Sequence, residues 1–135
     1  MARRYLLDSD ICIYQRRNDR PQIRERFAKL GADEAAISVV AYGELAYGME
    51  RSHDPVQAKD GLAQFVRLVP VVPLPPEAGV VYGEIRASLE RTGQIIGPND
   101  LWIAAHALAE DLILVTNNER EFRRVKGLKV ENWAR

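Results

Sequence analysis

The chain has 135 residues, 47% of them hydrophobic, and a formal net charge of zero at pH 7. This length and apolar content predict a single domain, residues 1–135, with a buried core, and they exclude a disordered chain. No apolar run reaches the ~20 residues that span a membrane, and Asp8 comes too early for a signal peptide, so we expect a cytoplasmic protein.

Apolar periodicity and turn-forming residues predict strands and helices that alternate along the chain. Strands are expected over residues 5–8, 35–39, 69–74, 112–116 and 128–130, and helices over residues 11–15, 21–31, 40–51, 55–68, 76–91, 98–111 and 119–124. Residues 16–20 are expected to form a polar loop, and 69–74 an edge strand, because prolines interrupt it. The residues expected to face inward from 76–91 are Val80, Val81, Ile85 and Leu89.

This alternation favours an α/β fold in which helices cover the faces of a central parallel sheet of about four to five strands. In such sheets, binding sites form beyond the carboxyl ends of the strands. Asp8 and the segment 116–118 lie at the ends of two predicted strands. We therefore expect functional residues at that edge of the sheet.

Three carboxylates stand where apolar runs and helices meet. Asp8 ends the first strand, Glu44 lies within an apolar helical stretch, and Asp100 lies in the first turn of a later helix. Carboxylates gathered in one pocket repel each other and are kept mainly to hold a hard cation such as Mg²⁺ or Mn²⁺. The pattern therefore predicts metal-assisted hydrolysis, with a phosphodiester as the favoured substrate. Each acid also has a structural alternative: helix capping for Asp8, a solvent-facing position for Glu44, and helix-dipole chemistry for Asp100.

Further polar residues follow the first and fourth predicted strands. Asn118 and Glu121 come after the fourth strand, and Glu121 either supplies a fourth acid or forms a surface ion pair with Arg124. Ser9 and Thr116 carry hydroxyls that can orient carboxylates in a supporting layer. Asp10 can steady its loop or reach a metal through water.

Charge is unevenly distributed although it sums to zero. Residues 1–30 and 119–135 are rich in Lys and Arg, whereas residues 31–118 are mainly acidic. If both ends lie beside the acids, one face of the molecule attracts phosphate while its centre holds metal. Alternatively, these arginines only cover solvated faces.

Taken in order, the motifs around these residues resemble those of PIN-domain ribonucleases, specifically the VapC-type toxins of type II toxin–antitoxin systems. The motifs span residues 6–14, 36–48, 96–107, 114–122 and 127–133. The likeness covers nearly the whole chain, and the order and spacing of the motifs are specific although each motif alone is weak. Two positions depart from the family pattern: Asp10 stands where asparagine is usual, and Asn118 stands where aspartate is often found.

The resemblance implies a three-layer α/β/α PIN fold and a metal-dependent endoribonuclease. It implies Asp8, Glu44 and Asp100 as catalytic acids and ligands of Mg²⁺ or Mn²⁺, with Asn118 or Glu121 contributing a fourth site residue. Hydrolysis would proceed by in-line attack of a metal-activated water at phosphorus. The basic residues expected to hold the RNA backbone are Arg16, Arg17, Arg20, Arg24, Arg123 and Arg124.

The resemblance also implies biological partners. The members most similar to this chain are endonucleases of initiator tRNA, which inhibit translation. The usual partner is a VapB antitoxin, whose tail covers the site and whose DNA-binding half links the pair to operator DNA. The family commonly forms homodimers, and no membrane partner is expected.

Two alternative functions remain open. A haloacid-dehalogenase-like phosphatase would also place Asp8-Ser9-Asp10 after a strand, but Cys12 stands where Thr or Val is expected, and the chain is short for that fold. A PIN-like module that binds RNA or protein without cutting is the second alternative, and the presence of all three acids argues against it. Cys12 itself, flanked by isoleucines, is expected to be a small buried residue.

Overall fold

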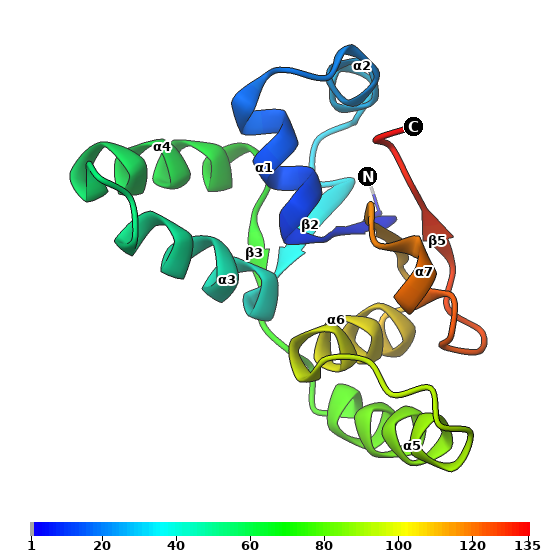
Figure 1. Ribbon diagram of the computed structural model, residues 1–135. Helices are drawn as coiled ribbons and strands as arrows, with labels where there is room; N and C mark the ends of the chain where they lie inside the picture. The colour runs from blue at the N-terminus through cyan, green and yellow to red at the C-terminus, as the bar shows by residue number, and fades with distance from the viewer. Residues whose placement is uncertain (1) are drawn as a thin grey trace.

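The computed structural model describes residues 2–135, which form one five-stranded sheet with seven helices around it (Figure 1). The strand order is β3-β2-β1-β4-β5, and every neighbouring pair is parallel. The strands are β1 (Tyr5–Leu7), β2 (Ala35–Ser38), β3 (Val71–Val72), β4 (Ile113–Val115) and β5 (Val130–Glu131). The helices are α1 (Ser9–Arg17), α2 (Pro21–Ala28), α3 (Val39–Glu50), α4 (Pro55–Leu68), α5 (Glu77–Arg91), α6 (Pro98–Ala109) and α7 (Glu119–Phe122). The predicted parallel α/β sheet is confirmed.

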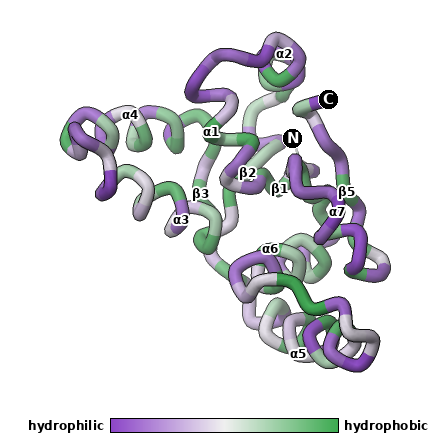
Figure 2. Tube along the Cα trace, in the orientation of Figure 1, coloured by the Kyte–Doolittle hydropathy of each residue, from purple (hydrophilic) through white to green (hydrophobic). Residues whose placement is uncertain are grey.

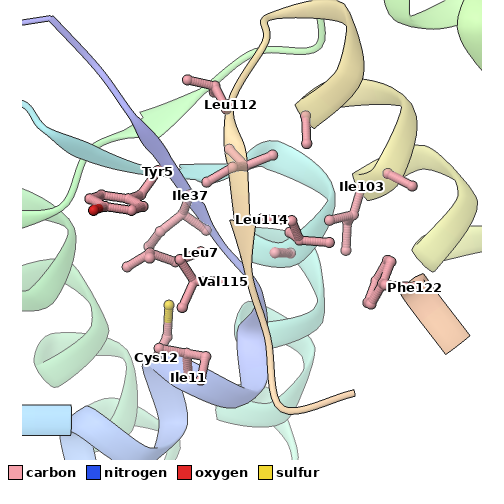
Figure 3. Close-up of a cluster of buried hydrophobic side chains, with 14 of the residues drawn as sticks. Tyr5, Leu7, Ile11, Cys12, Ile37, Ile103, Leu112, Leu114, Val115 and Phe122 are labelled. Carbon is pink, nitrogen blue, oxygen red and sulfur yellow. The ribbon is translucent and has the colours of Figure 1, made fainter. Parts of the chain in front are cut away.

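Buried side chains of the central strands contact helices on both faces of the sheet (Figure 3). On one face, Leu7 lies against Ile11 and Cys12 of α1, and on the other face Leu114 lies against Ile103 of α6. All five side chains are fully buried. The prediction that Cys12 is a small buried residue is therefore confirmed, and the sheet is the middle of three layers.

The strands differ in burial according to their place in the sheet. β1 and β2 are central and buried at every position, as continuous apolar runs in parallel sheets are. β3 is an edge strand of half-buried residues, as its prolines predict, and Pro70 still accepts a hydrogen bond from the backbone of Ile37. Hydrophobic residues run through the central strands, whereas the turn between α1 and α2 is hydrophilic throughout (Figure 2).

Helix α1 is longer than the sequence pattern indicates. The loop predicted for residues 16–20 is wrong for Arg16 and Arg17, which form the last turn of the helix. Positive charge is favourable at that end of the helix dipole. The helix stops at Asn18, whose left-handed backbone (φ 57°) lets its N–H bond back to the carbonyls of Tyr14 and Gln15.

The inward face predicted for α5 is partly wrong. Leu89 is buried, Ile85 is half-buried against the core and Val81 is half-buried, but Val80 is 68% exposed. Successive helical residues point about 100° apart, so Val80 and Val81 cannot both face α6. None of the helices in residues 2–135 is long and apolar enough to cross a membrane.

Replacing a central core side chain tests the packing directly. We expect Leu114→Ala to lower the free energy of unfolding by about 2–5 kcal/mol, because it removes buried methyl groups and leaves a cavity. Leu68→Ala is the matched control, since Leu68 is 83% exposed and its truncation should change stability by less than about 0.5 kcal/mol. Urea denaturation measures both, and equal losses would contradict this description of the core.

Candidate active site

The parallel register places Asp8 and Thr116 side by side at the carboxyl edge of the sheet. Leu7 pairs with Val115, so the next residue on each strand lies at the same level. Thr116 Oγ1 donates a hydrogen bond of 2.8 Å to Asp8 Oδ2, and the Ser9 backbone N–H donates one of 2.8 Å to Oδ1. Asp8 is only 6% exposed, and burial raises its pKa despite these two bonds. The carboxylate is thus held rigidly, and it also caps α1.

Two further helices bring Glu44 and Asp100 to Asp8. Glu44 lies on α3, and its Oε1 accepts a hydrogen bond of 3.3 Å from Ser9 Oγ. Asp100 lies in the first turn of α6. Burial raises the pKa of both acids, and the negative charge of Asp8 raises each pKa further. Three acids that are distant in sequence therefore share one electrostatic environment.

Asn118 joins Asp100 to Glu121. Its Nδ2 donates to Asp100 Oδ2 at 3.4 Å and to Glu121 Oε2 at 3.2 Å. Burial, followed by the repulsion of neighbouring carboxylates including Glu121, raises the pKa of Asp100 to about 7. Of the two roles considered for Glu121, the structure shows the one inside the acid cluster. Arg124, its proposed surface partner, donates instead to the carbonyl of Ile95 at 3.1 Å.

Asp10 lies at the rim of this cluster. Its Oδ2 accepts a hydrogen bond of 3.1 Å from the backbone N–H of Asn117, so it steadies the loop between β4 and α7. Burial and the charge of Asp8 raise the pKa of Asp10 to about 6. Its Oδ1 is buried and has no hydrogen-bond partner among the described residues. The acid cluster, defined as Asp8, Asp10, Glu44, Asp100 and Glu121, thus carries more negative charge than its protein donors offset.

The donor set of the acid cluster suits a hard cation that keeps part of its water. Within residues 2–135, no three His, Cys, Asp or Glu side chains converge closely enough to coordinate one ion directly. Mg²⁺ commonly binds through one or two carboxylates and retains several waters. The mutual repulsion of Asp8, Glu44 and Asp100 is the kind of strain that such an ion relieves. The residues present therefore fit a hydrated divalent ion.

Four of the six arginines predicted to bind RNA gather around the turn between α1 and α2. Arg24 Nη1 donates to the carbonyl and the side chain of Asn18, and Arg16 lies against α3. Arg17 is exposed, and Arg20 stacks on an aromatic ring. These four therefore form a basic surface at one end of α1.

The other two arginines are already engaged by the protein. Arg123 forms an ion pair of 2.8 Å with Glu119, and Arg124 holds the loop before α6 through the Ile95 carbonyl. The side chain of Arg123 is still 60% exposed. Their first role is thus to fix α7 in place.

Several supporting residues carry no signal that the sequence pattern reveals. The side chain of Asn99 hydrogen-bonds to Glu44, and Asn117 holds Asp10. His106 Nδ1 lies 3.0 Å from Ser38 Oγ. Because Ser38 is the residue directly before α3, this contact connects α6 to the start of α3. All these contacts join elements far apart along the chain. Only the position of a polar residue at a strand end or helix start hints at such a role.

Comparison with known proteins assigns this chain to a family. Residues 5–128 match the family described as the PIN domain. The tRNA(fMet)-specific endonuclease VapC of Shigella flexneri is 41% identical over 131 residues, which are 97% of this chain and 98% of that protein. The chain therefore belongs to the PIN-domain family, within its VapC branch.

Solved structures support the same assignment over the full length. DNA-bound VapBC from Salmonella typhimurium is similar with a TM-score of 0.92 and 37% identity, covering 98% of this chain and 99% of that chain. VapBC2 from Rickettsia felis, bound to a promoter DNA fragment, gives a TM-score of 0.89 and 37% identity, with coverages of 96% and 98%. The predicted PIN fold is confirmed, and the haloacid-dehalogenase-like alternative is wrong.

The raised pKa of Asp100 predicts how stability depends on pH without metal. The folded-state pKa is about 7 against an ordinary value of 3.8, so the folded protein binds a proton that the unfolded chain releases between these values. Stability should therefore fall as the pH rises through this window. We expect Asp100→Asn to flatten the fall between about pH 4 and pH 7, measured by urea denaturation in EDTA. The exposed Asp60→Asn variant should keep the wild-type profile, and an unchanged slope in Asp100→Asn would contradict the repulsion described.

Proposed function

We propose that this protein is a VapC-type endoribonuclease that hydrolyses RNA phosphodiester bonds with Mg²⁺ or Mn²⁺ at Asp8, Glu44 and Asp100. The observation that carries the proposal is that these acids gather at the carboxyl edge of the sheet, where the charge of Asp8 raises the pKa of both Glu44 and Asp100. The names of similar proteins, endonuclease and ribonuclease, support the same chemistry. Burying these carboxylates together lowers the stability of the fold, so a purely structural role does not explain the cluster.

The protein residues prepare the site in distinct ways. Asp8, fixed by Thr116 and the Ser9 backbone, presents a carboxylate that cannot rotate away. Asn118 holds Asp100 and Glu121 in one arrangement. A bound divalent ion would lower the pKa of the attacking water and stabilise charge on the phosphate oxygens.

Cation binding at this site would release protons. With a pKa of about 7, Asp100 carries a proton in a large fraction of metal-free molecules at neutral pH. A divalent cation would bind the carboxylate form of Asp100, so its binding would displace that proton and would strengthen as pH rises. Asp10, with a pKa of about 6, becomes negatively charged at a lower pH than Asp100 and adds that charge to the rim.

For the substrate, we propose initiator tRNA, whose cleavage would inhibit translation in the cytoplasm. The similar proteins from Shigella flexneri and Salmonella typhimurium carry the name tRNA(fMet)-specific endonuclease. Sequence-selective recognition of RNA usually targets unpaired loops, which a folded tRNA presents. The basic surface around α1 and α2 supplies charge for the backbone of such a substrate.

Loss of one fixed carboxylate should abolish cleavage. We expect Asp8→Asn to slow cleavage of purified initiator tRNA at least about 100-fold in Mg²⁺ or Mn²⁺, because it removes a charge at the proposed ion. EDTA should have the same effect on the wild type. Gel analysis of end-labelled initiator tRNA, with elongator tRNAs in parallel, measures both rate and selectivity.

Asp60→Asn is the control for the cleavage assay, since Asp60 is exposed on α4 and bonds only to Gln64. It should cut at the wild-type rate. Cleavage that survives in Asp8→Asn or EDTA would overturn the metal site. A folded wild type that cuts no RNA in any metal would favour the module that binds without cutting.

We also propose a VapB-type antitoxin as partner, with operator DNA bound through it, and a homodimer of the toxin. The solved VapBC complexes from Salmonella typhimurium and Rickettsia felis support this proposal. One apolar hollow of about 580 Å³ between α2, α4 and the chain entering β2 offers a surface for a partner. Phe27, Leu30 and the exposed Leu68 lie along it. The exposed Tyr47 and Val80 offer further apolar surface for a second copy.

Co-expression with the antitoxin tests the partner. We expect a stable complex that no longer cuts RNA. Leu68→Glu should weaken the complex about tenfold or more, because it sets a charge in the apolar hollow. Val56→Glu is the matched control on the same helix, since Val56 is 81% exposed and does not line the hollow. Titration calorimetry measures both variants, and equal affinities would place the antitoxin elsewhere.

A further inference from the structure

Arg20, at the start of α2, places its guanidinium over an aromatic ring. Its guanidinium carbon is 3.6 Å from the centre of the Tyr14 ring, which is van der Waals contact. Tyr14 is half-buried and packs on the core, so the ring is a firm support. The planar guanidinium keeps its N–H donors along its edge, where a phosphate can accept two of them at once.

The turn that carries Arg20 is also held in place. Asn18 closes α1 in a left-handed conformation, and Arg24 Nη1 donates to its carbonyl and its side chain at 3.2 and 3.1 Å. Pro21 fixes the first turn of α2 directly after Arg20. Little conformational entropy is therefore left to lose when a ligand binds there.

Tyr14 connects this position to the acid cluster. Its hydroxyl accepts a hydrogen bond of 3.2 Å from Asn117 Nδ2. The backbone N–H of Asn117 in turn donates a hydrogen bond to Asp10 Oδ2. The next residue, Asn118, contacts Asp100. The Tyr14 ring that supports Arg20 is thus hydrogen-bonded to the loop that borders the acid cluster.

The charge of Arg20 is uncompensated, which distinguishes it from most stacked arginines in residues 2–135. The arginines over aromatic rings are Arg4, Arg20, Arg26, Arg51 and Arg86. Three of them pair with carboxylates, namely Arg4 with Glu34, Arg26 with Glu131 and Arg86 with Glu90. Arg20 and Arg51 form no ion pair within the described part of the chain, and Arg51 is farther from its ring, at 5.5 Å.

We propose that Arg20, held against Tyr14, binds a backbone phosphate of the RNA strand that flanks the cleaved bond. This site rests on the proposed nuclease function and assigns its substrate path: the strand leaves the acid cluster over Asn117 toward the turn between α1 and α2. Because the contact is to phosphate, it positions the RNA without selecting its sequence. The nearby Arg17 and Arg24 add to the same positive field.

Salt-dependent RNA binding tests this site directly. The probe is a labelled, unstructured RNA of about a dozen nucleotides, and fluorescence anisotropy in EDTA prevents cleavage. We expect Arg20→Ala to weaken binding about tenfold and to lower the slope of log K against log salt by about 0.7, the value for one single-strand phosphate contact. Arg51→Ala is the matched control and should change neither quantity.

Two more variants separate charge from stacking. Arg20→Lys keeps the charge, so it should keep the salt slope while weakening binding severalfold through loss of the planar fork. Tyr14→Leu should also weaken binding severalfold with the slope unchanged. Thermal unfolding checks that each variant is folded, and Arg20→Lys carries the test if Arg20→Ala is not. Wild-type affinity and slope in a folded Arg20→Ala, or equal losses in Arg51→Ala, would overturn the proposal.

The RNA-binding test of Arg20 is independent of whether the protein cleaves RNA. If the wild type cuts RNA while Arg20→Ala binds like the wild type, the nuclease proposal stands and the phosphate site fails. If Arg20→Ala loses one phosphate contact while the wild type cuts nothing, the phosphate site stands and the nuclease proposal fails.

Discussion

The hydrogen bond from Thr116 to Asp8 joins the two strands on which the site depends. It lies at the carboxyl ends of β1 and β4, and it offsets part of the cost of burying a carboxylate that is 6% exposed. The remaining cost appears in the raised pKa of Asp8. The charge of Asp8 in turn raises the pKa of Asp10, Glu44 and Asp100. The fold therefore supports a site that is electrostatically unfavourable until a cation or protons neutralise it.

Rigid supports around the cluster keep that repulsion from opening the site. The loop after β4 is bound on one side to Asp10 and on the other to the last residues of the chain. Glu119, at the start of α7, accepts hydrogen bonds from Arg123, Arg135 and Asn132, and these bonds lower its pKa to about 2. The C-terminal residues thus fix α7, which carries Glu121 into the cluster.

Zero net charge conceals a separation of charge that suits a nucleic-acid enzyme. The acids converge at the carboxyl edge of the sheet, whereas Arg17, Arg20 and Arg24 lie around the turn between α1 and α2. A phosphodiester chain carries regularly spaced negative charge, so it can contact the basic surface while one phosphate lies at the proposed cation site. Close ion pairs neutralise other arginines, such as Arg26, and remove them from this role.

The sequence by itself determined the α/β class, through the alternation of apolar runs and helix starts along the chain. Its polar residues at strand ends and helix starts marked Asp8 and Asp100 as candidate site residues. It failed where neighbours distant in sequence decide. Arg16 and Arg17 extend α1, and Val80 faces solvent, because helix ends and helix rotation depend on capping and on packing against other elements. Only the tertiary structure placed Glu121 in the cluster, turned Arg124 to the Ile95 carbonyl and set Arg20 on Tyr14. Local pattern fixes what a residue can do, whereas long-range contacts fix which of its possible partners it meets.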